Sequence, residues 1–294
     1  MSLTSALGGP GPVRDWFEQR LPQTRGIVAP ANRELTVDNE VIAARARDRG
    51  AVGHAVDLLL RMSLRAYAPR PVMRTGIREV AFAAGEVASE AIATLRSLRL
   101  HERGPEVVDW DAAARASLVL AFMEQTERSG QAMESVSLRV FERPSTVEGW
   151  LSALAGHEDV EDLSRLAAAA VEDHLDLRSA TDLHLNPTFA LSAALSGADA
   201  DVIADGTLLD FKSTSTPRVV TREVVWQIVG YALLDRHDAY GLRSVGVSAL
   251  RWRRRWVRSL DEVVSDLGWR EGFSQLHADF AEWLARDTPP QAGG

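Results

Sequence analysis

The stretch DVIADGTLLDFK, residues 201–212, constrains the possible folds of this chain more than any other feature. It places an Asp-Gly pair between two short runs of apolar residues, and that arrangement is a strong signal for a two-residue β-hairpin turn. With Asp205 and Gly206 in the turn, Ala204 faces Thr207. The sequence therefore predicts a hairpin whose register is set by this turn, because a slip of one residue would move every side chain to the other face.

Extending this register outward gathers charged residues on the hairpin. Asp201 falls opposite Asp210, and Asp199 falls opposite Lys212. All four side chains would project from one face, because side chains alternate along a strand. Carboxylates directly across a ladder repel one another, and a bound hard cation such as Mg²⁺, which takes oxygen ligands, would relieve the repulsion. The hairpin therefore predicts a divalent metal site.

Lys212 is the only lysine among the 33 Lys and Arg residues of the chain. Lysine carries a compact charge with a tunable pKa, whereas arginine is a wide fork that stays protonated. An ammonium beside a metal-binding carboxylate can orient or deprotonate a water molecule, or stabilise developing negative charge. The simpler interpretation is a solvated, Asp-rich hairpin in which Lys212 forms an ordinary cross-strand ion pair with Asp199.

The rest of the chain is mainly helical before the hairpin and mixed after it. Apolar residues at three- and four-residue spacing predict helices, and alternation predicts strands. The predicted helices before the hairpin cover 13–21, 37–67, 78–100, 110–130, 145–156 and 158–177; after it come a helix at 221–238, one or two strands within 242–259 and a helix at 269–287. We expect a predominantly helical portion at 1–184, a core at 185–287 continuous with it in one domain, and a disordered tail at 288–294.

Composition narrows the class of protein. The chain has no Cys, which excludes disulfides, thiolate metal sites and a Cys nucleophile. A formal charge of −8 argues against a broad basic surface, so any contact with nucleic acid would be local. We find no apolar run of membrane-spanning length and no signal-peptide pattern, so a cytoplasmic protein without membrane contact is expected. The Walker, G-x-G-x-x-G and G-x-S-x-G motifs are also missing from the sequence.

The hairpin resembles the PD-(D/E)xK nuclease superfamily. That pattern has an acidic residue on one strand, a turn, and acid-x-Lys on the next strand, which Asp201 or Asp199 and Asp210-Phe211-Lys212 match. The helix that follows carries Gln227 and, four residues later on the same face, Tyr231. A Gln-x-x-x-Tyr helix in this place looks like the RecB-type branch of the superfamily. The resemblance covers roughly residues 185–260.

The resemblance implies an α/β, restriction-endonuclease-like fold. This would be a small mixed sheet, built on the 199–213 hairpin and strands at 243–258, with flanking helices and a large N-terminal helical portion. By the same resemblance, the ligands of Mg²⁺ or Mn²⁺ would be Asp201, Asp210 and the Phe211 carbonyl, with Asp199 as the alternative first acid. Lys212 would act on the attacking water, and Gln227 and Tyr231 would brace the site or the DNA end.

The upstream part of the RecB-type pattern is not matched. That pattern has a helix with Gly and, four residues later, His, whereas here Gly53 is followed by Asp57 and His54 is out of place. A helix could instead supply a further acid, for which the candidates are Glu86, Glu90 and Glu172. None has a distinguishing context, so we interpret them as parts of solvated helix faces.

The segment RWRRRWVRS, residues 251–259, is the most basic in the chain. Phosphate contacts and base stacking use arginine and aromatic residues, so the nucleic-acid-binding residues would be Arg251, Trp252, Arg253 and Arg255. The alternative is an edge strand whose arginines prevent aggregation and pair with acids. Both interpretations stay open from the sequence.

Together these features lead us to expect a Mg²⁺- or Mn²⁺-dependent nuclease that hydrolyses DNA phosphodiester bonds. One form of this activity is an exonuclease in DNA processing, repair or defence. RNA is an alternative substrate. Protein partners in a defence or repair complex are an open possibility. A second hypothesis is a catalytically inactive nucleic-acid-binding or assembly subunit on the same scaffold. A third is a helical scaffold protein with a structural acidic hairpin.

Overall fold

The computed structural model describes residues 3–37, 40–67, 78–129, 146–154, 156–192 and 198–287. The chain divides into two compact units, each described here by itself. The sheet unit comprises residues 1–40, 180–212 and 216–294, and the helical unit comprises residues 41–179 and 213–215. The expected tail at 288–294 lies outside the described residues.

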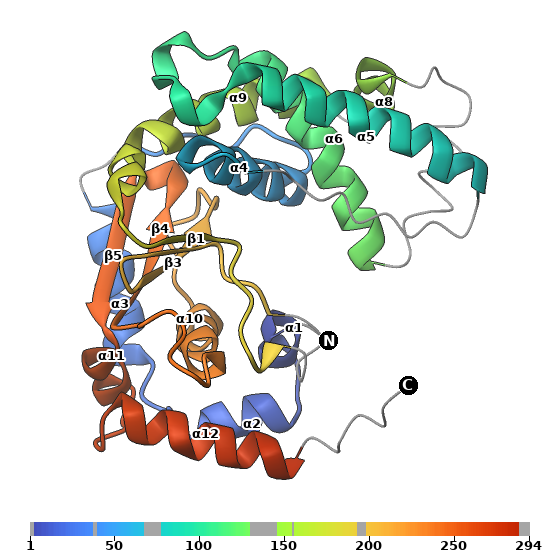
Figure 1. Ribbon diagram of the computed structural model, residues 1–294. Coiled ribbons are helices and arrows are strands. Elements are labelled where there is room, and N and C mark those ends of the chain that lie inside the picture. The colour runs from blue at the N-terminus through green and yellow to red at the C-terminus, as the bar shows by residue number, and fades with distance from the viewer. Residues whose placement is uncertain are drawn as a thin grey trace. The chain divides into compact units, whose positions relative to one another are not determined.

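The sheet unit is built on a five-stranded mixed sheet with the order β1-β2-β3-β4-β5 (Figure 1). The strands are β1 Leu183–Leu185, β2 Val202–Ala204, β3 Thr207–Lys212, β4 Ser244–Ala249 and β5 Arg254–Ser259. Only β3 and β4 run parallel, and the other neighbours are antiparallel. The fold of the described chain is therefore α/β, as expected.

The Asp-Gly hairpin is confirmed. Ala204 pairs with Thr207 and Val202 with Leu209. Asp205 and Gly206 both have positive φ angles, 46° and 76°, as a tight turn of this hand requires. Glycine is needed at the second position because a Cβ on Gly206 would lie 2.6 Å from the Gly241 carbonyl oxygen. The turn is thus fixed both by its own backbone and by the loop that precedes β4.

The parallel pairing of β3 and β4 requires a crossover, and helix α10 (Arg222–Leu234) supplies it. The helix begins at Thr221, whose hydroxyl accepts a hydrogen bond from the Val224 N–H. Every residue from Val225 to Leu234 is buried. The buried Trp226 also donates its indole N–H to the Leu21 carbonyl at 3.1 Å. Helix α10 packs on both β3 and β4.

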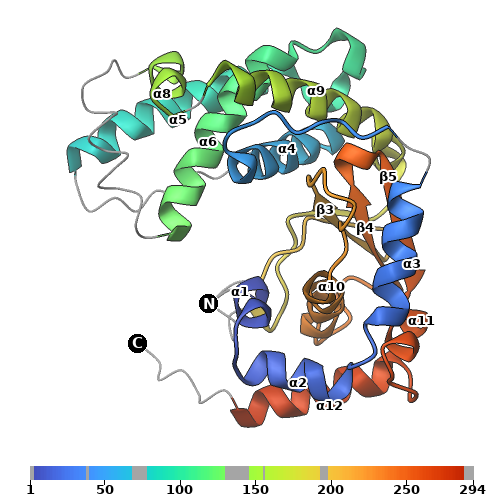
Figure 2. The same cartoon turned by 180° about the vertical axis from the view of Figure 1, so that it is seen from behind.

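Further helices complete the sheet unit (Figures 1 and 2). They are α1 Leu3–Gly8, α2 Pro12–Arg20, α3 Arg25–Thr36, α11 Leu260–Asp266 and α12 Phe273–Asp287. Helices α2 and α12 lie side by side, with the Trp16 and Phe280 rings 4.8 Å apart. Residues 1–40, which the sequence analysis groups with the helical portion, belong to the sheet unit because their apolar side chains pack on α10, α12 and β5.

The helical unit is a bundle in which α6 packs on each of the other long helices. Its helices are α4 Arg49–Leu64, α5 Arg78–Leu98, α6 Trp110–Ser129, α8 Val147–Leu154 and α9 His157–Asp173. Helix α4 is shorter than predicted, because residues 40–48 are not helical. Two buried carboxylates hold this segment instead: Asp159 accepts hydrogen bonds from the backbone of Arg47 and Asp48, and Asp162 accepts one from Ala46.

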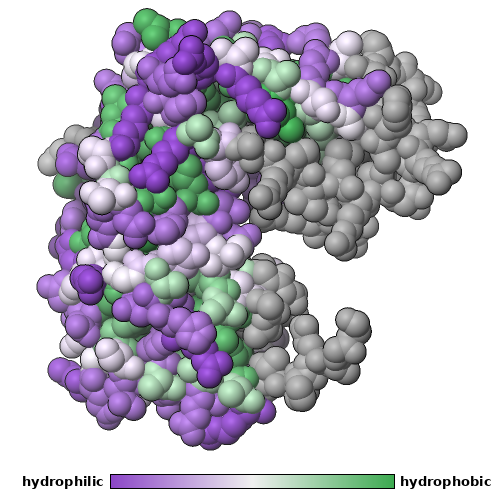
Figure 3. Space-filling view, viewed as in Figure 1, coloured by the Kyte–Doolittle hydropathy of each residue, from purple (hydrophilic) through white to green (hydrophobic). Residues whose placement is uncertain are grey.

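The surface in Figure 3 is mainly hydrophilic, with hydrophobic side chains in small groups. Among the described residues, the exposed large hydrophobic ones are Val37, Val107 and Val257, which are far apart in the sequence. Within the described part of the chain, no helix has the length and apolar character needed to span a membrane.

Candidate active site

Strand β3 brings Asp210 and Lys212 together on one face of the sheet. The Lys212 Nζ lies 2.6 Å from the Asp210 Oδ2. Asp210 is only 3 % exposed, whereas the Lys212 side chain is 25 % exposed. Two residues of one strand can make this contact because side chains at i and i+2 project to the same side. The acid-x-Lys element therefore combines a buried carboxylate with a lysine whose side chain is partly exposed.

Asp201, the first acid of the predicted pattern, forms a direct hydrogen bond with the acid-x-Lys element. Asp201 Oδ2 accepts a hydrogen bond of 2.6 Å from the backbone N–H of Phe211, the residue between Asp210 and Lys212. Asp199 lies elsewhere: it forms an isolated antiparallel bridge with Thr188. The strand pairs between β2 and β3 end at Val202, so the predicted pairing of Asp199 with Lys212 is not found among the described residues.

Helix α10 adds Gln227 and Tyr231 to the site. Lys212 Nζ donates to Gln227 Oε1 at 3.3 Å, and Gln227 Nε2 donates to the Tyr231 hydroxyl at 2.8 Å. Both residues are buried, at 7 % and 5 % exposure. A continuous polar network therefore runs from Asp210 through Lys212 and Gln227 to Tyr231. The sequence predicted that these four residues act together, and the tertiary structure places them in contact.

Charge and burial shift two pKa values in this network. Burial lowers the pKa of the Lys212 ammonium, but the Asp210 carboxylate, with a contribution from Asp201, outweighs burial and raises the pKa above its ordinary value of 10.5. Burial and the nearby Asp210 charge raise the pKa of the Tyr231 phenol. Lys212 is therefore a cation and Tyr231 a neutral phenol at neutral pH.

The donor set of the site fits a hard divalent cation. The buried Oδ2 of Asp210 has an ion-pair partner in Lys212, but among the described residues no donor reaches it with regular hydrogen-bond geometry. Mg²⁺ often takes one or two carboxylates and completes its shell with water and substrate phosphate. Within the described chain no group of three or more His, Cys, Asp or Glu side chains is arranged to hold a metal, so Asp201 and Asp210 would need oxygen ligands from the backbone, water or substrate.

Two residues that contact the polar network, Thr4 and Phe189, were not predicted from the sequence. Thr4, in α1, accepts a hydrogen bond of 3.0 Å from Gln227 Nε2. Phe189 stacks on the Tyr231 ring at 6.0 Å between centroids. No local signal marks Thr4, because it lies more than two hundred residues from Gln227 in the sequence. Phe189 lies in the segment NPTFA, near the start of the core expected at 185–287. The sequence alone indicates no role for this residue.

The basic segment is only partly accessible. Arg251 and Trp252 form part of a 3₁₀ turn after β4 and are 1 % and 8 % exposed. In this conformation both side chains are buried, so they do not present the exposed surface that phosphate contact or base stacking requires. Arg253 is exposed and Arg255 is half-buried. The expectation of nucleic-acid contact therefore applies to these last two residues only.

The candidate acids of the helical unit differ in their burial. Glu86, Glu90 and Glu172 are exposed on α5 and α9, in agreement with solvated helix faces. Asp57 instead forms a buried ion pair with Arg61 one helical turn away. Burial raises the pKa of the Asp57 carboxyl, and the Arg61 guanidinium opposes that rise. The pair is a structural element within α4.

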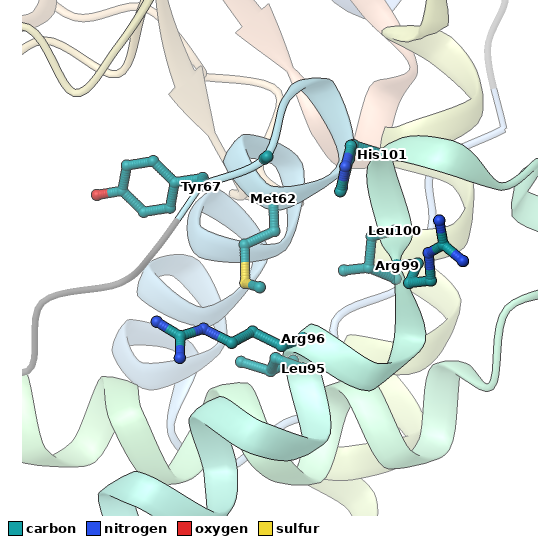
Figure 4. Close-up of a pocket in the computed structure, with 8 residues that line it drawn as sticks. Met62, Tyr67, Leu95, Arg96, Arg99, Leu100 and His101 are labelled. Atoms are coloured by element: carbon teal, nitrogen blue, oxygen red, sulfur yellow. The ribbon is translucent and has the colours of Figure 1, made fainter.

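The helical unit also contains a cavity of about 210 Å³ (Figure 4). Its lining residues are Met62, Ala66, Tyr67, Leu95, Arg96, Arg99, Leu100 and His101. Figure 4 shows Arg96 and Arg99 directed toward different sides, and both Arg99 and His101 pair with Glu102. These cations do not converge on one point, so the cavity lacks the arrangement of a phosphate site.

Comparison of the chain with protein-family models, with curated protein sequences and with solved structures finds no match.

Proposed function

We propose that this protein is a Mg²⁺- or Mn²⁺-dependent nuclease that hydrolyses phosphodiester bonds in DNA. The observation that carries the proposal is the network of Asp210, Lys212, Gln227 and Tyr231, in which strand and helix residues meet. Asp201 joins it through the Phe211 N–H. Two carboxylates, one ammonium and a buried amide on the face of a small mixed sheet agree with the PD-(D/E)xK pattern and with a restriction-endonuclease-like fold.

In this proposal Asp201, Asp210 and the Phe211 carbonyl hold the cation. A divalent cation in such a site polarises the phosphate and lowers the pKa of a bound water. The hydrogen bond from the Phe211 N–H fixes one Asp201 oxygen, and the other oxygen of that carboxylate is the ligand. Asp210 is held by the Lys212 ammonium, which pairs with its Oδ2. The protein's contribution is to fix both carboxylates before substrate arrives.

Lys212 acts as a hydrogen-bond donor in this arrangement. Its raised pKa keeps the ammonium protonated near neutral pH, so it cannot accept a proton from water while it is paired with Asp210. It can instead orient a water or stabilise negative charge that develops on a phosphate oxygen. Gln227 Oε1 fixes the direction of the ammonium. The sequence left open whether Lys212 orients a water molecule or deprotonates it. The geometry favours orientation of the water.

A cleavage assay tests the proposal. Purified protein with Mg²⁺ or Mn²⁺ should degrade at least one of linear double-stranded, circular double-stranded and single-stranded DNA. EDTA should stop the reaction, and the Asp210→Asn variant should be inactive. Binding of DNA without cleavage under all these conditions would instead indicate a non-catalytic nucleic-acid-binding subunit. Cleavage that persists in Asp210→Asn would show that a contaminating nuclease is responsible.

A further inference from the structure

Helix α1 is anchored on α10 beside the candidate site. Its Leu3, Ala6 and Leu7 side chains are buried, and α10 has Gly230 where α1 packs. A Cβ at Gly230 would lie 3.0 Å from Leu3 Cδ2. Arg14 also donates a hydrogen bond of 3.0 Å to the Leu7 carbonyl at the end of α1. The N-terminal helix is therefore packed in a defined place on the helix that carries Gln227.

Thr4 is the polar residue through which α1 reaches the site. The orientation of the Gln227 amide follows from its partners, because the Lys212 ammonium is a donor only and must face Oε1. Gln227 Nε2 then has two protons to donate. The Tyr231 hydroxyl accepts one at 2.8 Å and the Thr4 Oγ1 accepts the other at 3.0 Å. Both Nε2 protons and one of the two Oε1 lone pairs of the buried amide therefore have a partner.

We infer that Thr4 is a positioning residue that holds Gln227 and, through it, the Lys212 ammonium in the arrangement used for cleavage. Without the Thr4 hydroxyl, one Nε2 proton of the buried Gln227 amide loses its acceptor in the protein and depends on water, because Thr4 itself is exposed. The amide can then rotate toward other partners, and Lys212 loses a fixed acceptor. The effect on rate rests on the proposed nuclease activity, whereas the effect on the amide does not.

The alternative to be distinguished is that Thr4 only helps α1 to pack. Thr4→Val keeps the volume of the side chain and removes the hydroxyl, whereas Thr4→Ser keeps the hydroxyl and removes a methyl group. A packing role predicts the larger defect for Thr4→Ser, and a positioning role predicts it for Thr4→Val. Thr36→Val is the matched control, because the Thr36 hydroxyl donates to the Asn32 carbonyl within α3 and has no part in the network.

The kinetic test compares these variants on the DNA substrate that the parent cleaves. For Thr4→Val we expect kcat to fall roughly fivefold, as expected for the loss of one hydrogen bond to a buried group, with KM nearly unchanged. Thr4→Ser and Thr36→Val should stay close to the parent. If Thr4→Val is as fast as the parent, or if Thr4→Ser is as slow as Thr4→Val, the inference is overturned.

A second measurement does not depend on activity. The side-chain amide signals of Gln227 in an NMR spectrum, identified by their loss in Gln227→Glu, should move in Thr4→Val and stay in place in Thr4→Ser. An inactive parent would overturn the proposed function, and the amide signals would still decide the inference. Signals that do not respond to Thr4→Val would overturn the role of Thr4.

Discussion

The ammonium of Lys212 lies 2.6 Å from the carboxylate of Asp210, two residues earlier on the same strand. This contact joins the only lysine of the chain to a buried carboxylate. The same ammonium donates to Gln227 on α10. Lys212 is therefore held by residues of two elements of the sheet unit, β3 and α10.

Lys212→Arg should abolish cleavage and leave the fold nearly intact. A guanidinium has the charge but is too broad for a position between Asp210 and Gln227, and its five donors require another geometry. Loss of a positioned group of this kind typically costs about 10²- to 10⁴-fold in rate. Cleavage rates and thermal unfolding of parent and variant provide the measurement. A variant that cleaves within a few-fold of the parent would refute the role assigned to Lys212.

Asp210→Asn should lose both metal affinity and activity. The substitution keeps the shape of the side chain and removes one ligand charge from a hard-cation site. Isothermal titration with Mn²⁺ should show a stoichiometric site in the parent and much weaker binding in the variant. Asp266→Asn is the control, because Asp266 is exposed at the end of α11. Equal Mn²⁺ binding by parent and Asp210→Asn would argue against the proposed ligand.

Tyr231→Phe should reduce activity a few-fold without unfolding the protein. The ring and its stacking on Phe189 are kept, and Gln227 retains its bonds to Thr4 and Lys212. The loss of one hydrogen bond to a buried group should lower stability by about 1 kcal/mol. Chemical denaturation and single-turnover cleavage measure the two effects. Full activity in this variant would mean that the Gln-x-x-x-Tyr helix no longer supports the resemblance to the RecB-type branch.

The same substitution should change the response to alkaline pH. The Tyr231 pKa is raised in the folded protein above its ordinary value of 10, so above pH 10 the unfolded chain loses the phenolic proton while the folded chain keeps it. The unfolded state is then favoured, and the free energy of unfolding falls as pH rises. Denaturation curves at several pH values should show a steeper alkaline loss in the parent than in Tyr231→Phe. Parallel pH dependences would contradict the raised pKa.

Gly206→Ala should destabilise the hairpin on which the site depends. Its φ of 76° lies in the left-handed region, where a residue with a Cβ costs about 1–2 kcal/mol. The new Cβ would also meet the Gly241 carbonyl oxygen at 2.6 Å, so we expect a loss of stability above that range. Gly26→Ala is the matched control, because Gly26 is helical and a Cβ there meets nothing within 4 Å. If both variants are equally stable, the hairpin turn does not require glycine at position 206.

The sequence alone determined the local geometry of the site. The Asp-Gly pair set the hairpin register, because only a tight turn with positive φ angles joins the two strands. The period of two along a strand placed Asp210 and Lys212 on one face, and the spacing of four along a helix did the same for Gln227 and Tyr231. These are short-range rules, so they could be applied without knowledge of the fold.

Only the tertiary structure decided which surfaces meet. The burial of α10 turned Gln227 toward Lys212, and the packing of α1 on α10 brought in Thr4 across more than two hundred residues. Asp199 forms a β-bridge with Thr188, and Arg251 and Trp252 are buried. Residues 40–48 are not helical, and two buried aspartates accept hydrogen bonds from the backbone of residues 46–48. In each case long-range burial and hydrogen bonding outweighed a local preference worth only a few tenths of a kcal/mol to about 1 kcal/mol per residue, and such contacts are not encoded in any short stretch of the chain.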